Sequence, residues 1–168
     1  MPDLRSLLTF KETVRIGLWR GTGGAYAVEP DECPTVEDLI VNAGRIFLAR
    51  RIAGGDSQTP PGSAMAYMAV GTATAAPALT DTTLPGEIKR KVLSTNSAIT
   101  NNEYTAVATY GGFADTIQSI AITEAGVVNH ANSGQGTMLQ RVTFAAVTLA
   151  NSDLLKVELI TNVGSNTI

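Results

Sequence analysis

Beyond residue 63 the chain consists largely of short segments in which apolar and polar side chains alternate, and this two-residue period is the feature that most restricts its fold. In residues 104–110, for example, tyrosines and alanines fall on one face and threonine or valine on the other. Alternation with one apolar face is typical of antiparallel strands, whereas parallel α/β sheets bury both faces. Turns rich in glycine and asparagine separate the predicted strands, which cover residues 65–70, 87–94, 104–110, 117–124, 137–147 and 155–159. The chain is therefore predicted to be mainly β, with an antiparallel β-sandwich or jelly-roll-like domain at about residues 63–163.

One α-helix is expected before the sandwich, at about residues 35–53. Its apolar positions recur at helical spacing, namely Val36, Leu39, Ile40, Ala43 and Phe47. Thr35 is a suitable N-cap, and Gly54–Gly55 ends the pattern. Because 168 residues suit one domain rather than two, residues 34–168 are predicted to form a single domain.

Residues 1–33 are expected to be an extended N-terminal arm. Residues 21–32 (GTGGAYAVEPDE) are rich in glycine, which favours a loop that becomes ordered on contact with another subunit. Within the arm, residues 13–19 are compatible with a strand. No secretory signal is expected, since Asp3 and Glu12 interrupt the apolar residues.

The composition favours protein partners over nucleic acid or membrane. Charged residues make up 16% of the chain, against roughly 25% in typical soluble domains. Depletion of charge is a feature of interface cores, so an oligomer is expected. The net charge of −3 and the short basic groups Arg50–Arg51 and Lys89–Lys91 argue against nucleic acid, and no apolar run approaches the ~20 residues that span a membrane. Cys33 is the single cysteine and cannot form an intrachain disulfide, which fits assembly in a reducing cytoplasm.

No catalytic, cofactor-binding or metal-binding residue is predicted, and the chain is not expected to be an enzyme. His130 is the one histidine, and it lies in a polar turn without the spacing of a metal site. No serine lies in the G-x-S-x-G motif of a nucleophile elbow, and Cys33 at a helix start is expected to be structural. The glycine-rich residues 21–24 and 134–136 match no phosphate-binding loop and are predicted to be turns.

Five carboxylates are spread along the predicted loops and strands, namely Asp81, Glu87, Asp115, Glu124 and Asp153. Oxygen ligands of this kind can surround Ca²⁺, but their spacing matches no calcium loop. The preferred interpretation is structural, with Asp81 hydrogen-bonded to its own turn. A buried carboxylate needs a cation, so Glu87 or Glu124, if buried, is expected to pair with Arg90 or Arg141.

Residues 69–90 read AVGTATAAPALTDTTLPGEIKR, a long loop rich in alanine and threonine between two predicted strands. This segment resembles a connection in structural proteins of tailed bacteriophages, with Gly-Thr-Gly, then Pro, then Asp-Thr-x-Leu-x-x-Glu-x-x-Arg. The matching residues are Gly71, Thr72, Pro77, Asp81, Thr82, Leu84, Glu87 and Arg90, with Ala73 in place of the second glycine. Residues 41–45, 122–129 and 137–144 resemble further segments of the same proteins, although Val127–Val128 replaces the usual Leu-aromatic pair. The resemblance covers about residues 36–162.

The resemblance implies a component of the virion that has no chemistry of its own. A capsid decoration or cement protein on the head surface is favoured, assembled in the host cytoplasm as a homotrimer and bound to the major capsid protein. Residues 1–30 are expected to carry much of that contact. The alternative is a tail fibre or baseplate module with tail proteins as partners. A sugar-binding or sugar-cleaving module is disfavoured, because aromatic residues make up only 5% of the chain.

Overall fold

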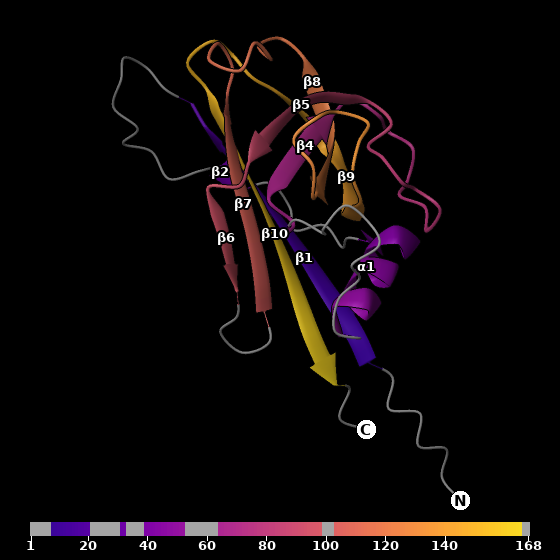
Figure 1. Ribbon diagram of the computed structural model, residues 1–168. Helices are drawn as coiled ribbons and strands as arrows, with labels where there is room; N and C mark the ends of the chain where they lie inside the picture. The colour runs from indigo at the N-terminus through magenta and orange to yellow at the C-terminus, as the bar shows by residue number, and fades with distance from the viewer. Residues whose placement is uncertain (1–7, 21–30, 33–38, 53–63, 99–102, 166–168) are drawn as a thin grey trace, which may run out of the picture.

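The computed structural model describes residues 8–20, 31–32, 39–52, 64–98 and 103–165. In these residues ten strands form two five-stranded antiparallel sheets, so the predicted antiparallel β architecture is confirmed (Figure 1). The inner faces of the two sheets share one hydrophobic core, as in a sandwich. No helix in the described part of the chain is long and apolar enough to cross a membrane.

The two sheets are built from strands that are far apart in the sequence. The first sheet has the order β2 (Asp31–Glu32), β1 (Leu8–Trp19), β10 (Leu154–Ser165), β7 (Glu103–Gly111) and β6 (Thr95–Ala98). The second has the order β3 (Leu39–Ile40), β9 (Met138–Thr148), β8 (Ala121–Val128), β4 (Tyr67–Gly71) and β5 (Glu87–Val92). The part of the chain that the structure describes contains one helix, α1 (Asn42–Ile52), which follows β3.

The alternation predicted for residues 104–110 and 155–159 is confirmed by the burial of β7 and β10. Ala106, Ala108 and Tyr110 of β7 face the core, and so do Leu155, Val157 and Leu159 of β10. Each fully buried aliphatic or aromatic side chain contributes roughly 1.5–3 kcal/mol. The Tyr110 hydroxyl donates a 2.7 Å hydrogen bond to the carbonyl oxygen of Met68, which ties the first sheet to the second.

The extended arm predicted for residues 1–33 is wrong for residues 8–19, which form β1. This strand pairs with β10 along its whole length, from Leu8 opposite Ser165 to Trp19 opposite Leu154. The side chains of residues 14, 16 and 18 (Val, Ile and Leu) enter the core, so the strand suggested for residues 13–19 is confirmed. Residues 31–32 also belong to the first sheet, as β2. Residues 1–7, 21–30 and 33 lie outside the described residues.

The predicted helix of residues 35–53 begins later than expected. Leu39 and Ile40 form β3 and pair with Arg141 and Gln140 of β9, and α1 begins only at Asn42. Pairing with a distant strand therefore overrides the helical spacing of the sequence around residue 39. The described helix ends at residue 52, close to the expected end. Residues 35–38 and 53, with the proposed cap Thr35, lie outside the described residues.

A second, smaller core covers the outer face of the second sheet. It contains Val41, Ala69, Leu84, Val128 and Met138, and Leu84 comes from the long connection between β4 and β5. Because this connection packs on the sheet, β8 is buried on both faces from residue 122 to residue 128. That double burial explains why β8 lacks the clear alternation of β7 and β10.

Candidate functional site

The connection between β4 and β5, residues 72–86, is called the β4–β5 loop below. Its one ionisable residue is Asp81. Its exposed residues are all uncharged, namely Thr72, Thr74, Ala75, Ala76, Ala78, Leu79, Thr80, Thr82, Thr83 and Pro85. The loop thus presents a neutral surface of alanine and threonine over the second sheet.

A buried ion pair beneath the β4–β5 loop joins the loop to the sheet. Arg141 of β9 and Glu124 of β8 have side chains that are 1% and 0% exposed, and Nε of the arginine lies 2.9 Å from Oε2 of the glutamate. Residues two apart in a regular strand lie on the same face, but Ile122 packs in the core between the sheets whereas Glu124 lies beneath the loop on the opposite face. A register shift in β8 between Ile122 and Glu124 accounts for this change of face. Arg141 also donates to Oδ2 of Asp81 at 2.8 Å and to the carbonyl oxygen of Ala75 at 2.9 Å. One guanidinium therefore holds the loop at two points.

The second carboxylate oxygen of Glu124 fixes the two ends of the loop. Oε1 accepts hydrogen bonds from the backbone N–H of Gly86 at 2.8 Å and of Ala73 at 3.3 Å. A Cβ on Gly86 would lie 2.9 Å from this oxygen, and a Cβ on Gly71 would overlap it. Glycine at both positions therefore gives the carboxylate its place between the loop ends. Thr123 strengthens the contact, because its hydroxyl donates to the carbonyl oxygen of Ala73 at 2.9 Å.

Asp81 closes a turn inside the loop, as predicted from the sequence. Its Oδ2 accepts the backbone N–H of Ala78 at 2.9 Å, and its own N–H donates to the carbonyl oxygen of Ala78 at 3.0 Å. Desolvation by itself would raise the pKa of Asp81. The hydrogen bond from Ala78, together with the hydrogen bond and charge of Arg141, outweighs desolvation and lowers this pKa below its ordinary value.

A second ion pair holds the turn between β8 and β9, residues 129–137. Arg90 of β5 binds Glu87 through two nitrogens, at 2.8 and 2.7 Å, and their side chains are 4% and 6% exposed. The same guanidinium donates to the carbonyl oxygens of His130, Asn132 and Gln135 at 2.7, 2.7 and 3.1 Å. Nδ1 of His130 accepts the backbone N–H of Asn132 at 3.1 Å, so the one histidine stabilises a turn. The sequence predicted that Glu87 or Glu124, if buried, would pair with Arg90 or Arg141. The structure confirms this expectation for both glutamates and gives the pairs as Glu87–Arg90 and Glu124–Arg141.

The other two carboxylates lie at the end of the sandwich formed by the β7–β8 and β9–β10 connections. Oδ2 of Asp115 accepts the backbone N–H of Gly111 at 2.8 Å and lies 2.9 Å from Nζ of Lys91. Oδ2 of Asp153 accepts the backbone N–H of Ala150 at 2.8 Å. The structure therefore divides the five carboxylates among separate partners, and the described residues contain no group of three side chains that could hold a metal ion.

The remaining residues discussed from the sequence fall into turns or outside the described part. Gly134 and Gly136 have φ values of +72° and +87°, which confirms the turn predicted at residues 134–136. Cys33 and residues 21–24 lie outside the described residues. The contact of Arg141 with Asp81 was not predicted, and its signal in the sequence was only that Asp81 is the sole charge in a long neutral loop.

These charged side chains position the backbone of the surface loops. Each carboxylate described above accepts backbone N–H groups, a cation or both, and together they help to hold the β4–β5, β7–β8, β8–β9 and β9–β10 connections in place. Neither a protein-family model, nor a curated protein, nor a solved structure significantly matches the chain.

Proposed function

We propose that the chain is a non-enzymatic structural protein of a tailed-bacteriophage particle, which decorates the head by binding across capsid subunits. The observation that carries this proposal is that buried charges hold neutral surface loops in place. The two ion-pair networks, Asp81–Arg141–Glu124 and Glu87–Arg90, are called the clamps below. Gly71, Asp81, Glu87 and Arg90 belong to the pattern that resembles phage structural proteins, and all four take part in these clamps. The resemblance thus coincides with the residues that shape the surface.

The distribution of charge supports a protein partner. Residues 104–155 contain four Asp, Glu, Lys or Arg residues, namely Asp115, Glu124, Arg141 and Asp153. None of them is more than 7% exposed. The surface formed by this part of the chain is therefore free of these charges, as is typical of the core of a protein–protein interface.

The clamps also favour binding by reducing its entropic cost. A loop that already has its bound conformation loses little conformational freedom on association. A protein that binds the assembled shell but not its separated subunits shifts the equilibrium towards the shell by mass action. The partners would be the major capsid protein and further copies of the same chain. Many bound copies would together resist the internal pressure of the DNA.

The contact with the head is assigned to the β4–β5 loop rather than to residues 1–30. Deleting residues 1–30 would remove β1 and expose its partner β10, so the deletion would disrupt the fold instead of testing the contact. A sharper test places charge on the neutral loop. Thr74→Glu and Thr82→Glu change exposed side chains in the loop, and Thr95→Glu changes an exposed side chain of β6 as a matched control.

The experiment measures binding of these variants to heads assembled without the chain, together with gold labelling of intact particles. We expect even labelling of heads, loss of binding by at least tenfold for the two loop variants, and unchanged binding for Thr95→Glu. Label confined to the tail would replace the head assignment with the tail fibre or baseplate alternative. Absence of label from the particle would reject a virion role.

A further inference from the structure

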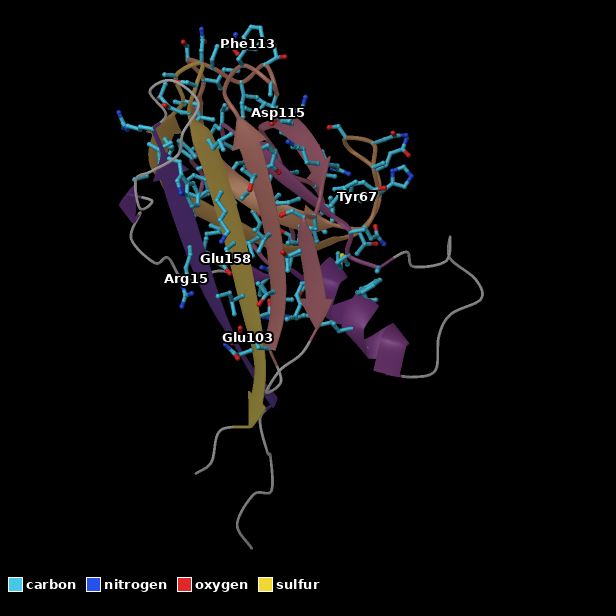
Figure 2. The ribbon with its side chains drawn as sticks, turned by 90° about the vertical axis from the view of Figure 1, so that its left-hand side faces the viewer. Arg15, Tyr67, Glu103, Phe113, Asp115 and Glu158 are labelled. Atoms are coloured by element: carbon cyan, nitrogen blue, oxygen red, sulfur yellow. The ribbon has the colours of Figure 1, made fainter. Side chains whose placement is uncertain are left out.

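The end of the sandwich opposite the start of β1 and the end of β10 is formed by two interlocked loops (Figure 1). They are the β7–β8 connection, residues 112–120, and the β9–β10 connection, residues 149–153, and they are called the tip below. Phe113 stands at the top of the tip, with Asp115 beneath it (Figure 2). Its side chain is 71% exposed, the most of any large apolar side chain in the described residues.

Hydrogen bonds hold the backbone of the tip in place. Three of them join the two loops, from Gly112 N–H to Asp153 O (3.0 Å), from Phe113 N–H to Asn151 O (3.1 Å) and from Ser119 N–H to Leu149 O (2.9 Å). Buried aspartates brace each loop from below, since Asp115 accepts Gly111 N–H and Asp153 accepts Ala150 N–H, both at 2.8 Å. The backbone on either side of Phe113 is thus fixed before any partner arrives.

Conformational strain in the described residues is concentrated in the same loop. Thr116 and Ser119 have φ values of +60° and +63°, and they are the only non-glycine residues of the described part with positive φ. Side chains disfavour this left-handed region by roughly 1–2 kcal/mol per residue. Residues in such conformations cluster at binding sites, where the surrounding structure holds them in place.

The exposed residues of the two tip loops carry no charge, and the nearby Lys89 and Lys91 of β5 pair with Asp115 at 3.8 and 2.9 Å. The exposed neighbours in the two loops are Ala114, Thr116, Ser119, Ala150, Asn151 and Ser152. The charged residues of the tip, Asp115 and Asp153, are buried and hydrogen-bonded. A single aromatic side chain on a rigid, neutral support matches the character of interface hot spots, which are aromatic and become fully desolvated.

We propose that Phe113 is the anchor of a second contact, which inserts into an uncharged apolar pocket of a protein partner in the particle. This inference rests on the proposed function, because it takes the partner to be a virion protein. A protein is favoured over a lipid bilayer because of the fixed backbone of the tip. A fixed and strained backbone benefits a partner of fixed shape, whereas a fluid bilayer adapts to any shape.

The test compares Phe113→Ser and Phe113→Leu with Val92→Ser in the full chain. Val92 lies at the end of β5, outside the two tip loops, and is 64% exposed, so its replacement removes an exposed apolar side chain that does not belong to the tip. The binding of each variant is measured on purified heads and on purified tails from particles assembled without the chain. Because both positions are exposed, the melting temperatures should stay close to that of the wild type, which checks that each variant folds.

We expect Phe113→Ser to weaken binding by about thirtyfold, the loss typical of an interface hot spot, and Phe113→Leu and Val92→Ser to stay within about threefold of the wild type. Equal binding of wild type and Phe113→Ser would overturn the inference and leave the proposed function standing. If the wild type binds neither heads nor tails, the proposed function fails and the inference fails with it. Binding to phosphatidylcholine vesicles that depends on Phe113 would also overturn it, in favour of a membrane contact.

Discussion

Replacing Arg141 by methionine removes the cation shared by Glu124 and Asp81 while keeping a long side chain in the same space. Glu124 is fully buried and keeps only the two backbone N–H groups of Gly86 and Ala73. The free energy of unfolding should therefore fall, because a buried carboxylate without its cation is costly.

The size of the loss follows from the burial of each partner. Removing one member of a buried ion pair costs about 3–5 kcal/mol, and this range applies to Glu124. Asp81 adds at most about 1 kcal/mol, because its side chain is 18% exposed and water can replace the lost arginine. With a typical urea dependence of about 2 kcal/mol per molar, the unfolding midpoint should fall by about 2 M.

Urea unfolding followed by the fluorescence of Trp19, the single tryptophan, measures this shift. Lys156→Met is the matched control, since Lys156 lies 3.8 Å from Glu158 at the surface and its side chain is 37% exposed. It should change stability by less than about 1 kcal/mol. The double variant Arg141→Met with Glu124→Gln should lose less stability than Arg141→Met alone, because no charge is then left buried.

Proteolysis reports separately on the β4–β5 loop. The loop contains no lysine or arginine, so trypsin cannot cut it, but thermolysin can cut beside Leu79, whose side chain is 41% exposed. Arg141→Met should accelerate this cleavage in the absence of urea. If Arg141→Met shifts the midpoint no more than Lys156→Met does, or leaves the cleavage rate unchanged, the ion pair does not hold the loop.

Three further predictions concern glycine, acid and alkali. Gly71→Ala should destabilise the chain by several kcal/mol, because the new Cβ would overlap Oε1 of the buried Glu124. Gly134→Ala should cost about 1 kcal/mol, because only its positive φ disfavours alanine. Thermal unfolding of both variants measures the difference, and equal losses would contradict the packing around Gly71. The lowered pKa of Asp81 means that its ionisation stabilises the fold above about pH 4 and that this stabilisation is lost as pH falls through the folded-state pKa. Urea titrations between about pH 5 and pH 2 should therefore show a shallower loss of stability for Asp81→Asn than for the wild type, and identical slopes would refute this role. Burial raises the pKa of Tyr104 to about 12 and that of Tyr110 well above its ordinary value of about 10. The contribution of both neutral tyrosines to the stability of the fold is therefore complete below about pH 10 and is lost as pH rises through their folded-state pKa values. Absorbance titration of tyrosinate should show both groups ionising only above about pH 11, and ionisation of every tyrosine near pH 10 would contradict their burial.

The strands with one apolar face could be predicted from the sequence because their signal is local. β7 and β10 alternate in sequence, and a sheet with one buried face requires that alternation. Alternate residues of both strands enter the core, although Val107 on the other face of β7 is also buried. β1 could not be predicted along its full length, because its pairing partner lies at the other end of the chain. The helix was predicted too long for a similar reason, since Leu39 and Ile40 satisfy helical spacing but pair with β9.

The candidate site was predictable in its pairs but not in its arrangement. A buried carboxylate requires a cation, and this rule named Arg90 and Arg141 as the partners of Glu87 and Glu124, without assigning each arginine to its glutamate. It could not show that Arg141 also reaches Asp81, because that contact depends on the path of the β4–β5 loop. The tip carried no comparable signal, because its two loops are joined by hydrogen bonds between backbone atoms, which no side-chain pattern records.

The pairing of β1 with β10 sets the order in which the chain can fold during synthesis. Trp19 is made early and its partner Leu154 late, so at about 5–20 residues per second the first strand waits on the order of ten seconds for its neighbour. During that interval the edge of β1 that pairs with β10 has no partner, and strands with unpaired edges can associate with one another. Lys11, Glu12 and Arg15 interrupt its apolar residues, and charges in these positions discourage premature pairing. Charge in the strand that is made long before its partner therefore lowers the risk of pairing with a wrong edge.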